Sequence, residues 1–212
     1  MKKILAIILV LALCLPLLAC GSSNIKFDDP QWQYDKFLEY ITNKQYQEAL
    51  DFYWANFSLR DYKDAKKYYE FSQIMDTEYS KGRLGYTYRE LSDLYDLPAA
   101  AQVLREIEGK IDFLNGEWKQ EDDSGLTRYL AFKDGYAVQQ LVESTQGDSG
   151  FQYKDKDFIY EIVEHTHEDG TTVLAIGKDT AIYHLKETNQ ITLVKLAGSD
   201  FDTFDGQYTK IS

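Results

Sequence analysis

Two histidines in the C-terminal half have a spacing that suits metal ligands. His165 and His167 lie two residues apart, so an extended chain would point both imidazoles to one face of a strand. The side chains that would complete a zinc-type set of nitrogen and oxygen ligands are Glu164, Glu168 and His184. The segment adjoins the Asp169-Gly170 pair, however, where polar side chains at a hairpin tip face water. We therefore expect an exposed hairpin tip and no bound metal.

Carboxylates are abundant, but none of them forms a recognisable acid–base pair. The stretch KQEDDSG has the character of a solvated loop rather than of the raised-pKa pair that glycoside hydrolysis needs. No stretch has the spacing of an EF-hand calcium loop, and FDTFDG is only weakly similar to one. A Gly-x-Ser-x-Gly elbow and a phosphate-binding loop are also absent. We expect no enzyme and no cofactor, with a metal-dependent hydrolase using the three histidines as a remote alternative.

A further residue that could carry chemistry is Cys20, in the stretch LPLLACGSS. Lys2 and Lys3 precede an uncharged apolar run from Ile4 to Ala19, which is the composition of a secretory signal sequence. That run has 16 residues, whereas a helix needs about 20 apolar residues to cross a bilayer. Pro16 would also interrupt a helix just before the cleavage region.

The segment Leu17-Leu18-Ala19-Cys20 resembles the lipobox of bacterial lipoproteins. The resemblance implies that residues 1–19 are removed and that the Cys20 thiol carries a diacylglyceryl group with palmitate-type chains. Two acyl chains anchor a protein stably, whereas one binds only marginally. We therefore expect a lipid anchor on the extracytoplasmic face of a cell membrane, either a Gram-positive plasma membrane or an outer membrane. An ordinary secretory signal followed by a stray cysteine is the alternative.

The mature chain expected from this cleavage is acidic and has a single cysteine. Loss of Lys2 and Lys3 lowers the basic residues from 23 to 21 against 35 acidic ones, so 193 residues carry a net charge of −14. Such a surface repels nucleic acid and anionic head groups, so no nucleic-acid partner is expected and the lipid must hold the protein at the membrane. Without a disulfide the fold must depend on its hydrophobic core.

The chain from Pro30 to Ile111 has the periodicity of helices. Asp29 is the expected N-cap of a first helix, with Pro30 at its first position. The apolar face of this helix is expected to consist of Tyr34, Phe37, Leu38 and Ile41. Further along, Leu97-Pro98 marks a break between later helical segments.

Two segments of the helical half share one pattern: Tyr, any residue, an acid, Ala, and then an aromatic pair. The pattern occupies Tyr46–Tyr53 and recurs 16 residues later at Tyr62–Tyr69, about half of the tetratricopeptide period. Through NKQYQEAL and RDYKDAKKYY this half resembles tetratricopeptide-like helical-hairpin proteins. A regular superhelix with a peptide groove and a compact bundle of four or five helices both remain open. The tyrosines are expected to pack in the core.

Short strands separated by turns are expected from Gly116 to Ser212. Asp134-Gly135 and Asp169-Gly170 lie between apolar runs, where tight hairpins need positive φ. A third such pair is Asp205-Gly206, and a short turn through Thr188-Asn189 joins two more runs. About eight antiparallel strands follow in sequence order, and closure into a barrel would best remove their exposed edges.

The opening strand contains Gly116-Glu117-Trp118, which resembles the Gly-x-Trp start of lipocalins and lipocalin-like domains. The resemblance implies that Trp118 plugs one end of the barrel and packs on a basic residue of the last strand, here Lys210. The residues nominated for ligand binding or for filling the interior are Trp118, Phe158, Tyr160, Ile162, Tyr183 and Leu185. An eight-stranded barrel can be solid with side chains, and a filled interior is favoured.

The expected fold is α+β, an N-terminal helical-hairpin bundle followed by an antiparallel up-and-down β-barrel or rolled sheet. The expected divisions are a signal peptide (1–19), a lipid-anchored linker (20–29), a tetratricopeptide-like helical domain (30–113) and a lipocalin-like β domain (114–212). The expected function is a non-enzymatic binding module for an apolar small ligand or a protein partner. The alternative is a structural or assembly subunit of a cell-envelope complex that binds a protein through the helical half.

Overall fold

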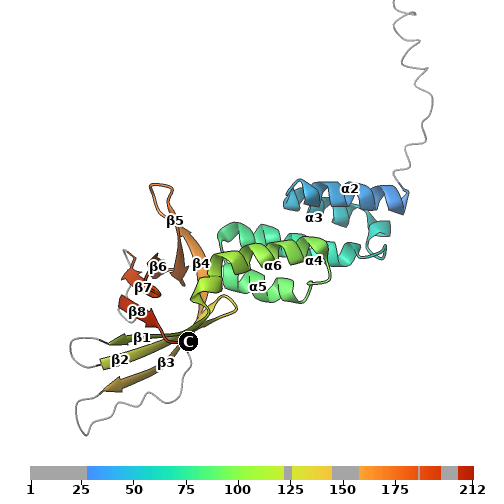
Figure 1. Ribbon diagram of the computed structural model, residues 1–212. Helices are drawn as coiled ribbons and strands as arrows, with labels where there is room; N and C mark the ends of the chain where they lie inside the picture. The colour runs from blue at the N-terminus through green and yellow to red at the C-terminus, as the bar shows by residue number, and fades with distance from the viewer. Residues whose placement is uncertain (1–27, 122–125, 145–157, 186, 197–204) are drawn as a thin grey trace, which may run out of the picture.

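The computed structural model describes residues 28–121, 126–144, 158–185, 187–196 and 205–212. Within these ranges five α-helices come first and eight strands follow (Figure 1), which confirms the predicted α+β order. The predicted leader, the lipobox and most of the linker lie outside the described residues. None of the helices in the described ranges has the length and apolar character needed to span a bilayer.

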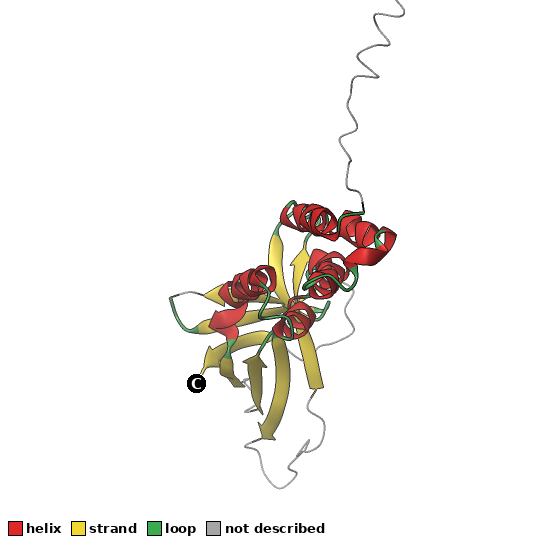
Figure 2. Ribbon diagram, turned by 90° about the vertical axis from the view of Figure 1, so that its right-hand side faces the viewer, coloured by secondary structure: helices red, strands yellow, loops and turns green. Residues whose placement is uncertain are grey.

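The helices of the N-terminal half run side by side and are seen nearly end-on in Figure 2. Their bounds are α2 Pro30–Thr42, α3 Tyr46–Ala55, α4 Ala65–Thr77, α5 Leu84–Ser92 and α6 Pro98–Ile111. Short 3₁₀ turns are η1 Phe57–Leu59, η2 Tyr79–Lys81 and η3 Asp112–Leu114.

Local sequence signals set where the helices begin. The Asp29 side chain accepts a hydrogen bond from the Gln31 N–H at 3.0 Å, and Pro30 is the first residue of α2. Leu97 has an extended backbone because a proline follows it, and α6 therefore starts at Pro98. The predicted apolar face of α2 is buried, except that Leu38 is half-buried.

The repeated tyrosine pattern brings α3 and α4 together. Ala49 and Ala65 are both fully buried, so the two backbones can approach closely, and the Tyr53 and Tyr69 rings stack with centroids 4.5 Å apart. The two copies differ at their starts. The first begins α3, whereas α4 begins only at the alanine of the second, because Lys63 adopts a positive φ of 49° just before it.

The eight strands form a closed antiparallel barrel in simple sequence order, so the barrel alternative of the prediction is confirmed. Their bounds are β1 Gly116–Glu121, β2 Leu126–Lys133, β3 Tyr136–Ser144, β4 Phe158–Thr166, β5 Thr172–Ile176, β6 Thr180–Leu185, β7 Gln190–Lys195 and β8 Gly206–Lys210. Closure occurs between the first and last strands, where Trp118 pairs with Lys210.

The hairpin turns follow the predicted chemistry at three of four positions. Asp134 and Gly135 have φ values of 52° and 81°, as a two-residue type I′ turn requires. Gly170 and Asn189 also have positive φ, at 84° and 49°. The Asp205-Gly206 pair instead opens β8, and there Gly206 has a φ of 128°, a backbone angle that glycine adopts far more readily than other residues.

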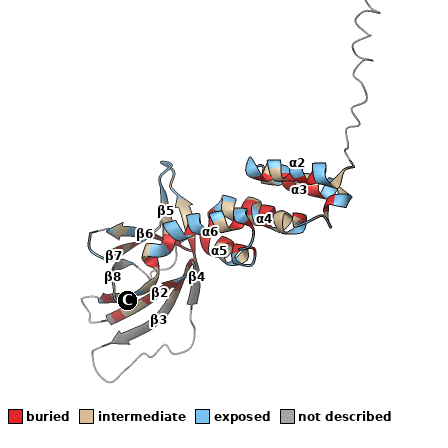
Figure 3. Ribbon diagram, turned by 45° about the vertical axis from the view of Figure 1, so that its right-hand side comes forward, coloured by how far each residue is buried: buried red, intermediate tan, exposed pale blue. Residues whose placement is uncertain are grey.

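One continuous core runs from the helices into the barrel. Buried residues of this one cluster occur on the helices and on the strands (Figure 3). The large buried side chains of the barrel are Trp118, Leu130, Phe132, Ile162, Ile176, Ile182, Ile191, Leu193 and Tyr208. The described inward side chains therefore fill much of the barrel interior.

Candidate functional site

One end of the barrel is closed by Trp118. This side chain is 1% exposed, and its indole N–H donates a hydrogen bond to the Leu114 carbonyl at 2.7 Å. The Lys210 ammonium lies 5.6 Å from the centre of the indole ring and donates to the Phe113 carbonyl at 3.2 Å. The predicted packing of Trp118 on a basic residue of the last strand is confirmed, and η3 completes the plug.

A polar row crosses the barrel wall beside this plug. Gln120 on β1 pairs with Arg128 on β2, and the Arg128 guanidinium donates to the Gln120 side-chain oxygen at 3.1 Å. On the other side β1 pairs with β8, and the register that joins Trp118 to Lys210 places Gln120 beside Tyr208. The side chains of Gln120, Arg128 and Tyr208 therefore lie on the inner face of adjacent strands, among apolar side chains.

Tyr208 is the unusual member of this row. It is fully buried, and its hydroxyl has no hydrogen-bond partner among the residues that the structure describes. Burial raises the pKa of Tyr208 to about 12, while nearby Arg128 opposes the rise. A buried hydroxyl without a partner is costly, and a bound water or a ligand group could supply that partner.

The raised pKa of Tyr208 predicts a loss of stability at high pH. The unfolded tyrosine loses its proton near pH 10, whereas the folded one holds it until about 12. The stabilisation is therefore complete below pH 10 and falls as the pH rises to 12, by up to about 2–3 kcal/mol. Urea unfolding at several pH values would measure this fall. The Tyr208→Phe variant should show a shallower fall, and an identical pH dependence in both proteins would contradict the assignment.

The nominated interior residues divide between the two faces of the barrel wall. Trp118 and Ile162 are buried inside it, and Tyr160 is half-buried against the core. The side chain of Phe158 lies outside the described part of the structure. For Tyr183 and Leu185 the predicted interior position is wrong, because they are 42% and 45% exposed on the outer face.

The error on β6 is a choice of the wrong face. Ile182 pairs with Leu193, and both are buried, which shows that the alternate residues point inward. The strand TAIYHL has apolar side chains on both faces, so the alternation of side chains did not identify the inner one. Whether any nominated residue binds a ligand stays a prediction.

The three histidines do not come together as one site. The rings of His165 and His167 lie 5.1 Å apart and, with Tyr183, line an open cleft of about 890 Å³ on the outside of the barrel. His184 instead stacks on Phe113, with ring centroids 4.2 Å apart. No group of three or more histidine, cysteine or acidic side chains that could hold a metal occurs in the described residues.

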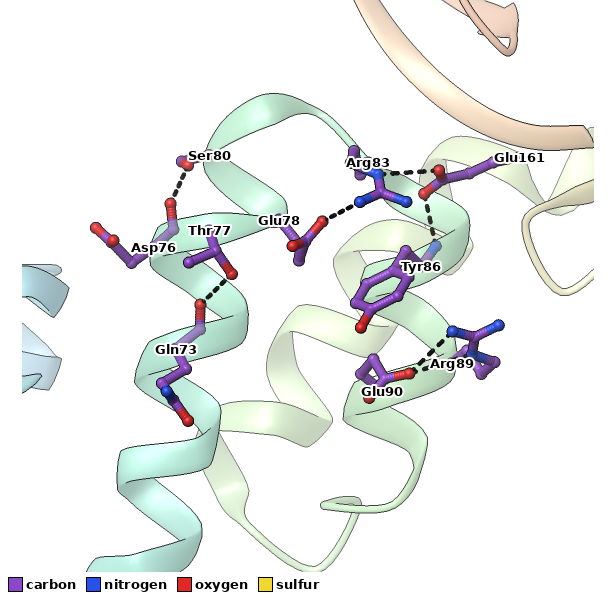
Figure 4. A network of polar contacts seen from close by, with 10 residues as sticks. All are labelled: Gln73, Asp76, Thr77, Glu78, Ser80, Arg83, Tyr86, Arg89, Glu90 and Glu161. Atoms are coloured by element: carbon purple, nitrogen blue, oxygen red, sulfur yellow. Dashed lines mark hydrogen bonds and ion pairs between the residues drawn. The ribbon is translucent and has the colours of Figure 1, made fainter.

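A charged cleft of about 700 Å³ lies where the helices meet the barrel. Here the Arg83 guanidinium donates to Glu161 at 3.0 Å and to Glu78 at 2.5 Å, and Glu161 also accepts from the Tyr86 N–H at 2.8 Å (Figure 4). Lys110 and Glu164 form a further ion pair at 2.7 Å. The ion pairs at this cleft therefore connect the helices to β4 of the barrel.

No protein-family model, curated protein or solved structure matches this chain. The lipocalin-like character therefore depends on the closed eight-stranded barrel and the Trp118 plug.

Sequence reasoning did not nominate the polar row of Gln120, Arg128 and Tyr208. A signal for it was present, because an inward Trp118 requires the residue two positions later on the same strand to point inward as well.

Proposed function

We propose that this protein is an extracytoplasmic lipoprotein, anchored through Cys20, whose barrel binds a small amphipathic ligand without chemical conversion. The helical half serves as a spacer between anchor and barrel. In support, the chain enters the described fold at the start of α2, at the end of the molecule farthest from the barrel (Figure 1). The acidic net charge of the expected mature chain favours a lipid over electrostatic attraction as the link to the membrane.

The observation that carries the binding proposal is the buried, unpartnered hydroxyl of Tyr208. Tyr208 pairs with the buried Ile191 of β7, and Arg128 is close enough to influence its titration. A ligand with an apolar body and an acidic or hydrogen-bonding head matches this combination, because the head would supply the missing partner and meet the guanidinium. A purely apolar ligand would leave the hydroxyl unsatisfied.

The Tyr208→Phe variant tests the proposal through two opposite effects. Removing the unpaired hydroxyl should raise the free energy of unfolding of the ligand-free protein by about 1–2 kcal/mol, because a buried unsatisfied group is lost. The same change should weaken the binding of a fluorescent polyene fatty acid about tenfold, because one hydrogen bond is lost. Fluorescence titration measures the affinity, and urea unfolding measures the stability.

Two comparisons sharpen this experiment. The methyl ester of the same fatty acid lacks the carboxylate, so its weaker binding should change less in Tyr208→Phe. Tyr183→Phe removes a hydroxyl from the outer face of the barrel and should leave the affinity for the acid unchanged. Absence of probe uptake by the folded protein, or equal effects of both substitutions, would refute binding inside the barrel.

A further inference from the structure

Large aromatic side chains are exposed on α2, on α3 and on the η1 turn that follows α3. Phe57 is 75% exposed, Trp54 is 57% exposed and Trp32 is 38% exposed. Trp54 and Phe57 both contact Arg60, and these three residues are called the aromatic patch. Large apolar rings gathered at one place on a surface usually mark a contact site rather than a chance exposure.

The patch is held in place by contacts of its own. The Arg60 guanidinium lies 4.6 Å from the centre of the Trp54 ring and 4.8 Å from that of Phe57, and it donates to the Trp54 carbonyl at 3.2 Å. The Trp54 indole N–H donates to the Tyr69 hydroxyl at 3.2 Å. In the described residues Arg60 forms no ion pair, so its charge is not neutralised by a carboxylate.

The patch lies beside the point where the chain enters the fold. The Ser58 hydroxyl donates to the Gln33 side chain at 2.6 Å, which fixes η1 against the first turn of α2. The ring of Trp32 on the same turn lies 6.4 Å from that of Phe52 on α3. The patch therefore lies at the α2 entrance, and the barrel is at the opposite end of the molecule (Figure 1).

The distance from the lipid site to the patch is limited by the chain. Pro30 follows Cys20 by ten residues, and ten residues span at most about 35 Å when fully extended. A lipid on Cys20 would thus keep the start of α2 within that distance of the bilayer surface. Such a tether gives the patch a high effective concentration at the membrane, so even a weak surface affinity is sufficient.

We propose that the aromatic patch inserts into the headgroup region of the phospholipid bilayer in which Cys20 is anchored. Tryptophan rings favour this interface, and a guanidinium beside them can bind a lipid phosphate. The patch then holds the helices against the membrane and directs the barrel away from it. This inference rests on the lipidation of Cys20 in the proposed function, and it names the bilayer surface as the occupant of the patch.

Tryptophan fluorescence in tethered protein tests the insertion directly. Cys20 is the single cysteine of the chain that begins there, so its thiol can be coupled to a maleimide phospholipid in phosphatidylcholine vesicles. This chain keeps every described core residue, from Tyr34 to Tyr208. Vesicles with brominated acyl chains should quench the emission of Trp54, whereas Trp118 inside the barrel should be unaffected.

The variants separate the patch from the rest of the surface. Trp54→Phe should lose most of the quenching, and Arg60→Gln or Phe57→Ser should reduce it. Val194→Ser, which alters an exposed apolar residue of the barrel, should leave the quenching unchanged.

Chemical coupling makes the result independent of whether cells lipidate Cys20. The mass of the protein extracted from cells tests lipidation separately. Equal Trp54 emission in brominated and plain vesicles would overturn the insertion. The same holds if Trp54 is unquenched in vesicles while substitutions in the patch abolish the binding of an envelope protein, because the occupant would then be a protein.

Discussion

Replacing Trp118 with alanine is expected to lower the free energy of unfolding by about 3–5 kcal/mol. The indole is 1% exposed and packs edge-on against Phe132, with ring centroids 6.4 Å apart. Its removal leaves a cavity at the closed end of the barrel and deprives the buried Leu114 carbonyl of its donor. The Lys210 ammonium would also lose the ring beneath it. Urea unfolding followed by far-ultraviolet circular dichroism would measure the loss.

The matched control is Trp54→Ala, the same change at a tryptophan that is 57% exposed. Its expected effect is within about 1 kcal/mol, because little buried surface is lost. Trp118→Phe retains a ring in the plug but removes the indole N–H, so it should fall between the two alanine variants. Equal destabilisation by the two alanine substitutions would contradict the role of Trp118 as the plug of the barrel.

The sequence signals that predicted the barrel are local ones. Asp134-Gly135 and Asp169-Gly170 encode tight turns through the backbone angles that glycine permits, and the structure has hairpins at both. Asp29 and Pro30 likewise determine the start of α2 within a few residues of chain. Where a few neighbouring residues decide the conformation, sequence alone was sufficient to predict it.

Features that depend on partners far along the chain were not predictable in the same way. The Arg83–Glu161 pair joins residues 78 positions apart, and no local pattern indicates it. The inner face of β6 was assigned wrongly because both faces of that strand carry apolar side chains, and only its pairing with β7 resolves the choice.

The candidate binding site contains one residue that the sequence predicted and one that it did not. Trp118 was found from a short motif. Tyr208 lies on a strand whose register across β1 is determined by barrel closure, so its position beside Gln120 requires the complete fold.

The contact of the helices with the barrel depends on two glycines, and Gly85→Ala should disrupt it. Gly85 on α5 lies against the Asp134-Gly135 turn, and a Cβ at this position would overlap the Gly135 carbonyl oxygen. That oxygen already accepts a hydrogen bond from the Ile162 N–H at 2.8 Å, so it cannot move aside without breaking the bond. We expect a loss of about 2–3 kcal/mol in the free energy of unfolding, at the upper end of the usual penalty for overpacking.

Gly109→Ala is the control for this substitution. Gly109 lies inside helix α6, and no atom outside its own helical surroundings lies within 4 Å of a Cβ built on it. Alanine stabilises a helix interior relative to glycine, so this variant should gain about 0.5–1 kcal/mol. Both substitutions add one methyl group to a helix, but only the methyl group at Gly85 meets the barrel. The expected changes in the free energy of unfolding therefore have opposite signs. Thermal and urea unfolding would measure both variants, and a gain in stability for Gly85→Ala would show that α5 does not hold the barrel through this contact.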